Sequence, residues 1–225
     1  MDLAEAESAA LFGRPKAHGS SLGVADVGKP RDPVTEWEDH VAAQFAALKR
    51  FASSRGCTLK KEHLPPFMTS ATPGREVTVY YDAKGNRVWK ATFPGQSGFG
   101  HFGFFTPAGY LRRLRLSNLI FDDDVTFEGI WNRQGGPSII TSQAYIQPHP
   151  HRFIPTEDEI SAFLHGLGFV MNETTGLWER DDGIELADTH DRNFIRAPDE
   201  NLYAIDVQPR LLPSYEWGKV RSLKS

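Results

Sequence analysis

The sequence contains a single cysteine, Cys57, among its 225 residues. No disulfide can therefore form within the chain, and so little cysteine is typical of a reducing compartment. No apolar run approaches the roughly 18 residues of a membrane-spanning helix. The first residues include Asp2 and Glu5 and lack the basic side chains that begin a secretory signal peptide. These absences predict a cytoplasmic protein that does not contact a membrane.

Basic residues are also fewer than acidic residues. The 25 lysines and arginines are outnumbered by 29 aspartates and glutamates, which gives a net charge of -4. Proteins that coat nucleic acid neutralise many phosphates with basic side chains, so the composition argues against nucleic acid as a partner. Hydrophobic residues make up 40% of the chain and charged residues 24%, which is typical of an ordinary globular protein.

The first 31 residues differ in composition from the rest of the chain. They are rich in alanine, glycine, serine, lysine and proline, and Phe12 is their only aromatic residue. A segment with so little to bury cannot offset the entropy that it loses on ordering. We therefore expect residues 1–31 to form a flexible leader that the fold does not need.

Residues 32–60 predict a helical extension. Thr35 and Glu38 have the spacing of a capping box. An apolar stripe follows at helical spacing, formed by Trp37, Val41, Phe45 and Leu48. This pattern predicts a helix over about 34–54 that ends near Gly56.

A strand-rich lobe is expected over 61–147. The segments 76–81 and 87–92 are rich in strand-forming residues and flank a tight turn, which predicts a β-hairpin. A second hairpin is predicted from 125–131 and 138–146. Both hairpins would contribute to an antiparallel sheet.

A helix is predicted between the two hairpins. Thr106 supplies an N-cap and Pro107 a first-turn proline, and we expect the helix to end near Asn118. Its expected inward face is formed by Tyr110, Leu111 and Leu114. Three basic side chains are expected to face solvent, namely Arg112, Arg113 and Arg115.

A second, shorter lobe is expected over 148–225. Thr156 and Glu159 form a capping box for a helix that reaches about Leu167. Short strands between polar turns are predicted at 169–172, 177–180, 184–187, 193–196 and 202–207. The order of elements predicts an α+β fold with antiparallel strands and few helices, because the regular strand–helix alternation of a parallel sheet is absent.

Three side chains with oxygen atoms stand beside these short strands near the C-terminus. Asp188 and Asn193 are five residues apart, and Asp206 follows thirteen residues after Asn193. Mg²⁺ takes hard oxygen ligands and is usually held by one or two carboxylates together with substrate phosphates. The three residues therefore predict a magnesium site.

The same residues carry a resemblance to a known family. The pattern Asp188-x-His190-x-x-Asn193, followed by Asp206, resembles the catalytic and metal loops of protein-kinase-like phosphotransferases, most closely the aminoglycoside and choline kinase branch. Upstream, Val88-Trp89-Lys90 resembles the third-strand lysine motif. Over residues 74–212 the chain is similar to the kinase domain found in polyvalent proteins, which are large multidomain proteins of phages and conjugative elements. This resemblance implies a compact two-lobed kinase-like fold.

The resemblance also implies roles for individual residues. Asp188 would be the catalytic base that orients an acceptor hydroxyl, and Asn193 and Asp206 would hold Mg²⁺ on the phosphates of ATP. Lys90 would contact the α- and β-phosphates. The remaining implied nucleotide contacts are Gly74 at the phosphate loop and a hinge for adenine that includes Ser142, Gln143 and Ala144. The implied activity is transfer of the γ-phosphoryl group of Mg²⁺–ATP to a hydroxyl of a protein or a small molecule.

The sequence departs from the family pattern in its short C-terminal lobe and at two places that concern nucleotide binding. Only Pro73-Gly74 stands where a glycine-rich phosphate loop is expected. The predicted helix after Thr106 has no acidic residue to pair with Lys90, and Glu128 on the next strand is the nearest substitute. These departures leave two alternatives to an active kinase. One is a pseudokinase that binds nucleotide or protein, and the other is a structural accessory protein of a mobile element.

Overall fold

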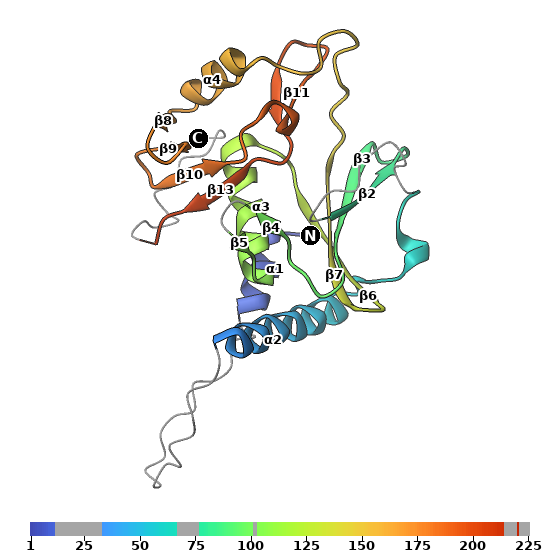
Figure 1. Ribbon diagram of the computed structural model, residues 1–225. Coiled ribbons are helices and arrows are strands. Elements are labelled where there is room, and N and C mark those ends of the chain that lie inside the picture. The colour runs from blue at the N-terminus through green and yellow to red at the C-terminus, as the bar shows by residue number, and fades with distance from the viewer. Residues whose placement is uncertain (12–32, 67–76, 101–102, 214–219, 221–225) are drawn as a thin grey trace, which may run out of the picture.

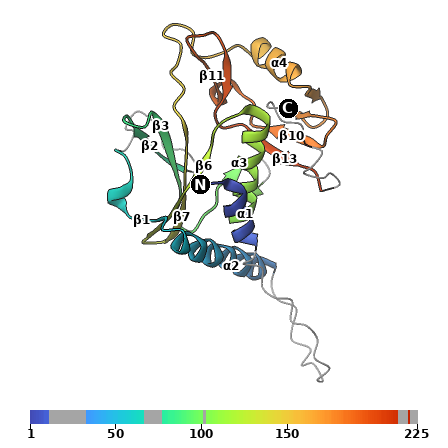
Figure 2. The ribbon, with the colours of Figure 1, turned by 180° about the vertical axis from the view of Figure 1, so that it is seen from behind.

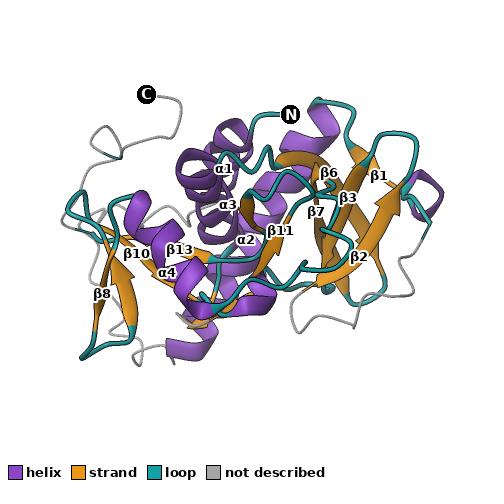
Figure 3. Cartoon of the chain, turned by 90° about the horizontal axis from the view of Figure 1, so that it is seen from above, coloured by secondary structure: helices purple, strands orange, loops and turns teal. Residues whose placement is uncertain are grey.

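The computed structural model describes residues 1–11, 33–66, 77–100, 103–213 and 220. The five-stranded and four-stranded sheets lie in two lobes, with helices packed between and below them (Figure 1; Figure 3). The prediction of an α+β fold with antiparallel sheets is confirmed. None of the helices in the described residues is long and apolar enough to cross a membrane.

The first lobe contains a five-stranded sheet in the order β1-β6-β7-β3-β2. Its strands are β1 (Thr58–Leu59), β2 (Val77–Asp82), β3 (Arg87–Thr92), β6 (Thr126–Arg133) and β7 (Gly136–Ala144). Only β1 pairs in parallel, with β6, and the other pairs are antiparallel. Two short strands, β4 (Phe99–Gly100) and β5 (Gly103–Phe104), pair separately. Both predicted hairpins are therefore present.

Local chemistry explains the first hairpin and the parallel edge of this sheet. At the β2–β3 turn, Asp82 Oδ1 accepts hydrogen bonds from the backbone N–H groups of Lys84 and Gly85 at 3.0 and 3.1 Å. At the edge, Gly129 has a φ of +150° and lies so close to β1 that a Cβ atom would stand 2.0 Å from the carbonyl oxygen of Cys57. Only glycine permits this approach, because it has no Cβ atom.

Three helices lie beside the five-stranded sheet, of which the first two contact β6 and the third packs against the first. They are α1 (Leu3–Leu11), α2 (Pro33–Ser54) and α3 (Pro107–Phe121), and a short 3₁₀ turn, η1 (Lys61–His63), follows β1. The predicted bounds of α2 are close to those observed. In α3 the predicted cap is confirmed, since Thr106 Oγ1 accepts from Gly109 N at 3.0 Å. The helix continues three residues beyond the predicted end at Asn118, to Phe121.

Helix α1 corrects the prediction of a flexible leader. Figure 2 shows α1 beside α3 and above α2. Leu3, Ala6 and Ala10 are buried in the first hydrophobic core, and Met1 O accepts a hydrogen bond from Phe127 N at 3.1 Å. The prediction was wrong for residues 3–11 because small residues at helical spacing let one helix pack closely against another, which composition alone does not reveal. The rest of the predicted leader lies outside the described residues.

The arginines of α3 are also placed differently from the prediction. Arg113 is buried rather than exposed, and its guanidinium lies 4.9 Å from the ring centre of Phe105 and 5.3 Å from that of Tyr110. Arg112 and Arg115 are partly exposed and hold Glu7 of α1, at 2.8 and 3.4 Å. The Glu7 side chain is only 4% exposed, so α1 is fixed by a nearly buried charge as well as by apolar packing.

Replacement of Glu7 by glutamine is expected to destabilise the protein by roughly 1–3 kcal/mol. Removing one partner of a buried ion pair leaves the other charge uncompensated, and the partial exposure of the two arginines moderates the full cost of about 3–5 kcal/mol. Glu5→Gln is the matched control, because its pair with Arg55 at 3.3 Å is about half exposed on both sides and contributes little. Urea unfolding measures both variants. Equal stability of Glu7→Gln and Glu5→Gln would contradict the docking of α1.

The second lobe combines a four-stranded sheet, a hairpin and one helix. The sheet has the order β13-β10-β9-β8, and β11 pairs with β12. The elements are α4 (Glu157–Gly166), β8 (Val170–Asn172), β9 (Leu177–Glu179), β10 (Ile184–Ala187), the 3₁₀ turn η2 (Asp191–Asn193), β11 (Phe194–Arg196), β12 (Leu202–Ala204) and β13 (Gln208–Leu211). The predicted strand over 202–207 ends earlier, at Ala204, and β13 was not predicted.

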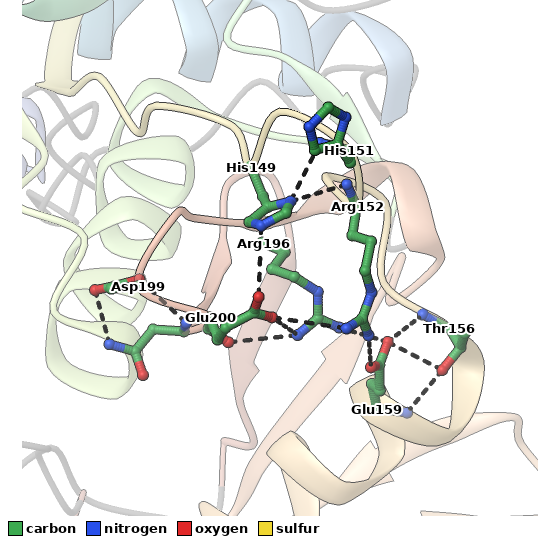
Figure 4. Close-up of polar contacts among 9 residues, drawn as sticks. His149, His151, Arg152, Thr156, Glu159, Arg196, Asp199 and Glu200 are labelled. Carbon is green, nitrogen blue, oxygen red and sulfur yellow. Dashed lines mark hydrogen bonds and ion pairs between the residues drawn. The ribbon is translucent and has the colours of Figure 1, made fainter.

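A network of polar contacts joins the segment that connects the two lobes, around His149, to the second lobe (Figure 4). Glu159 caps α4 by accepting from Thr156 N at 2.8 Å and pairs with Arg196 of β11 at 2.5 Å. Arg196 also lies 3.4 Å from Glu200, which lies 3.4 Å from His149. These contacts fix α4 and the β11–β12 hairpin relative to each other. The C-terminal half of α3 completes the core beneath them with Leu116, Ile120 and Phe121.

Candidate functional site

Lys90 of β3 connects the two lobes. Its Nζ atom donates a hydrogen bond to the carbonyl oxygen of Ile205 at 2.9 Å and lies 3.7 Å from Oδ1 of Asp206. The lysine side chain is 16% exposed and that of Asp206 is 53% exposed. A lysine from the first lobe and a carboxylate from the second therefore meet where solvent still reaches the carboxylate.

Asp188 follows β10 directly and is held on both of its carboxylate oxygens. Gln208 of the neighbouring strand β13 donates to Oδ2 at 3.1 Å, and His190 Nε2 lies 3.2 Å from Oδ1. The backbone φ of Asp188 is 59°, a left-handed conformation that aspartate and asparagine tolerate better than most residues. Asp188 is 35% exposed, so its carboxylate is fixed in orientation and still accessible.

Asn193 is buried in the turn η2 and joins the other predicted residues. Its Nδ2 atom donates to the backbone carbonyl of Asp188 at 2.7 Å, and its own carbonyl accepts from Ile205 N at 2.9 Å. Hydrogen bonds thus connect Asp188 to Asn193 and Asn193 to Ile205, the residue before Asp206, and Lys90 contacts both Ile205 and Asp206. The structure brings these four predicted residues together.

The oxygen atoms of this cluster can coordinate Mg²⁺ only if a substrate supplies further oxygen ligands. Asp206 offers a carboxylate, and Asn193 offers its amide oxygen because its nitrogen is bonded to Asp188. No group of three or more histidine, cysteine, aspartate or glutamate side chains that could hold a metal occurs in the described residues. The donors are hard oxygens and few, which fits Mg²⁺ when substrate phosphates and water complete the coordination.

Asp123 is an acidic residue of this site that the sequence analysis missed. It follows α3 and accepts a hydrogen bond from Ser117 Oγ. Burial raises the pKa of its carboxyl to about 7, and the Ser117 hydrogen bond and the charge of Lys90 oppose this rise, whereas the charges of Asp122 and Asp206 add to it. Asp123 therefore interacts electrostatically with both Lys90 and Asp206. The only signal in the sequence was the acidic run at 122–124, whose position depends on where α3 ends.

The raised pKa of Asp123 predicts a pH dependence of stability. Its carboxyl titrates near 3.8 when unfolded and near 7 when folded. At a pH between these two pKa values, Asp123 is protonated in the folded state and ionised in the unfolded state. The stabilising contribution of Asp123 is therefore greatest below pH 3.8 and is lost as the pH rises through about 7. The loss amounts to a few kcal/mol, at about 1.4 kcal/mol per pKa unit. Asp123→Asn should remove this loss.

Urea unfolding between about pH 5 and pH 8 measures this dependence. We expect wild type to lose more stability than Asp123→Asn across this range. Asp158→Asn is the control, because Asp158 is exposed on α4 and its charge does not contribute to the raised pKa of Asp123. If Asp123→Asn and wild type show the same pH dependence, Asp123 does not titrate near neutral pH.

Glu128, the predicted substitute partner for Lys90, is placed elsewhere. Its Oε1 atom accepts from Thr126 Oγ1 at 2.8 Å and from Ser142 Oγ at 2.5 Å. Lys90 pairs with Thr141 of β7, so the Lys90 and Thr141 side chains lie on the same face of the sheet. Ser142, which Glu128 contacts, is the next residue on β7 and points to the opposite face. Lys90 and Glu128 therefore lie on opposite faces of the sheet. Glu128 therefore does not replace the missing helix acid.

The predicted hinge residues lie at the end of β7. Ser142 is buried within the ladder, between Trp89 of β3 and Thr126 of β6, and Gln143 pairs only with β3. Tyr145 N donates toward β3, to Asn86 O at 3.0 Å. The backbone N–H and C=O groups of successive strand residues point to alternate sides of the strand. Those of Ala144 therefore point away from β3, to the side where β6 no longer runs beside β7. Gly74, the predicted phosphate-loop residue, lies outside the described residues.

A groove of about 650 Å³ opens beside the Asp188 loop. Thr189, His190 and Asp191 form one wall, and residues 155–158, 160 and 161 around the start of α4 form another. Trp178 and Met171 contribute apolar surface. A molecule in this groove would lie next to the carboxylate that His190 contacts.

Comparisons with known proteins give one match. The model of a family described as the serine/threonine/tyrosine kinase found in polyvalent proteins matches residues 42–212. No curated protein and no solved structure matches the chain.

Proposed function

Because the chain belongs to the family of serine/threonine/tyrosine kinases found in polyvalent proteins, we propose that it transfers the γ-phosphoryl group of Mg²⁺–ATP to a hydroxyl group. The observation that supports this most strongly is the contact of Lys90 with Ile205 and Asp206 across the two lobes. It places a cation from one lobe beside a carboxylate from the other, and a polyphosphate with its metal ion needs both charges.

Asp188 is the proposed catalytic base. Gln208 and His190 each contact one of its oxygens, which orients the carboxylate toward an acceptor hydroxyl. The hydroxyl oxygen forms a bond to the γ-phosphorus as the bond from that phosphorus to the β,γ-bridging oxygen breaks, and the hydroxyl proton passes to Asp188. ADP leaves with the bridging oxygen, and the phosphorylated acceptor is the second product.

The other residues bind and orient the nucleotide. Asn193 and Asp206 would hold Mg²⁺, which neutralises negative charge on the phosphates when it is bound. Lys90 would contact the α- and β-phosphates. The backbone of the hinge residues would pair with adenine, chiefly at Ala144, whose N–H and C=O point past the end of β6. The groove beside His190 would admit the acceptor.

A pseudokinase is the second candidate function. The observation in its favour is that Asp123, an acidic residue just after α3 that interacts with Lys90, has a raised pKa that leaves it partly protonated near neutral pH. A partly neutral partner would hold the lysine less firmly than an ionised glutamate. Such a protein would bind Mg²⁺–ATP and would not transfer phosphate.

ATP should stabilise the protein in the presence of Mg²⁺. A ligand present at about ten times its Kd stabilises the folded state by roughly 1.4 kcal/mol, which a thermal-shift titration detects. Lys90→Ala should lose this shift, and Lys84→Ala, an exposed lysine in the turn of the same hairpin, should keep it. Absence of any shift in wild type would overturn nucleotide binding.

A further inference from the structure

An apolar groove runs along α2, away from the proposed site. Its volume is about 1230 Å³, and its floor includes Val41 and Phe45. Val34 and Trp37 at its N-terminal end are 61% and 42% exposed. Exposed apolar surface of this extent usually marks a site of association.

The geometry of α2 limits what can cover this groove. Figure 1 shows α2 at the bottom of the molecule, with its C-terminal end beside the β6–β7 hairpin and its N-terminal end extending to the other side. Its 22 residues span roughly 33 Å at about 1.5 Å per residue. Ala42 and Ala46 near its middle are exposed and line the groove, and such small side chains allow another helix to approach closely.

The charges along the groove are complementary to those of a second, antiparallel copy of the same groove. Glu38 and Lys49 both line it, and they lie at equal distances on either side of the Ala43–Gln44 peptide. If a second α2 lies antiparallel with a twofold axis at that peptide, Glu38 of each copy stands opposite Lys49 of the other. Neither residue has a charged residue three or four positions away on its own helix, so these charges are not paired along α2.

We propose that a second copy of this chain covers the groove, through an antiparallel and symmetric contact between two α2 helices. The exposed N-terminal half of each α2, with Val34 and Trp37, lies over the C-terminal half of the other, near the wall that Gly95 and Pro137 contribute. Two Glu38–Lys49 pairs flank the central alanines and fix the register. This symmetry closes at two copies, because each copy uses the same surface.

Sedimentation velocity on the full chain tests the proposal. A contact made mainly by one helix of each copy is expected to be smaller than a standard interface, so we expect a monomer–dimer equilibrium with a Kd of about 1–100 μM. Glu38→Lys and Lys49→Glu should each weaken the dimer at least about tenfold, since like charges then face each other twice. Glu36→Lys is the control, because Glu36 is exposed on α2 and does not line the groove.

Mixing the two charge variants gives the sharpest outcome. In a heterodimer of Glu38→Lys with Lys49→Glu, both facing pairs are again opposite in charge, so an equimolar mixture should dimerise about as well as wild type. Three results would overturn the proposal: a wild type that stays monomeric at high concentration, charge variants that dimerise like wild type, or a mixture that shows no recovery. The first would mean that another segment or partner covers the groove.

Discussion

Phosphoryl transfer by Asp188→Asn is expected to fall by a factor of about 10² to 10⁴, the usual contribution of a positioned general base. Asparagine keeps an oxygen for the hydrogen bond from Gln208 and tolerates the left-handed backbone of this position, where φ is 59°. It cannot accept the hydroxyl proton. The variant should therefore fold normally and bind Mg²⁺–ATP with nearly unchanged affinity.

Initial rates of transfer to serine, threonine and tyrosine peptides measure this effect, with calorimetry of ATP binding on the same preparations. The expected loss corresponds to roughly 3–5 kcal/mol of activation free energy. Asp188→Ala is less suitable as a variant, because alanine is strained at this φ. If Asp188→Asn transfers phosphate at the rate of wild type, Asp188 is not the base.

Asp206→Asn is expected to abolish most of the Mg²⁺-dependent part of ATP affinity. Mutation of residues that only hold a metal ligand in place lowers metal affinity about 10–100-fold. Asp206 is the one carboxylate proposed to contact Mg²⁺ directly, so we expect its loss to lower the affinity by an amount near the upper end of this range. Asparagine has the same shape and keeps one oxygen. Its missing charge also weakens the contact with Lys90, now 3.7 Å away.

Calorimetric titration with ATP, with and without Mg²⁺, separates these effects. Asp206→Asn should bind ATP alone about as well as wild type and gain little from Mg²⁺. Asp191→Asn is the control, because Asp191 is in the same lobe and lines the groove rather than the metal site. Unchanged Mg²⁺ dependence in Asp206→Asn would remove Asp206 from the metal site.

Much of this fold was predictable because its signals are local. Alternating strand residues around the turn at 83–86 predicted the β2–β3 hairpin, and Thr156 with Glu159 predicted the start of α4. The spacing of Asp188, Asn193 and Asp206 predicted that they would act together, since each stands beside a short strand that fixes its backbone.

The features that sequence analysis missed depend on tertiary contacts. Helix α1 is stable because Ala6 and Ala10 pack in the core and Glu7 meets the arginines of α3, and no local pattern identifies those partners. The side of the sheet that Glu128 faces depends on an irregularity in β6 between Phe127 and Gly129. Asp123 reaches the site because α3 extends to Phe121, beyond its predicted end.

Transfer of radioactive phosphate from ATP tests the central claim most directly. Wild-type protein is incubated with Mg²⁺ and ATP labelled in either the γ- or the α-phosphate, alone and with protein and small hydroxyl acceptors. The proposed function predicts label on the protein or an acceptor from γ-labelled ATP only, and only when Mg²⁺ is present. Binding of Mg²⁺–ATP without transfer to any acceptor would contradict the kinase activity and favour the pseudokinase.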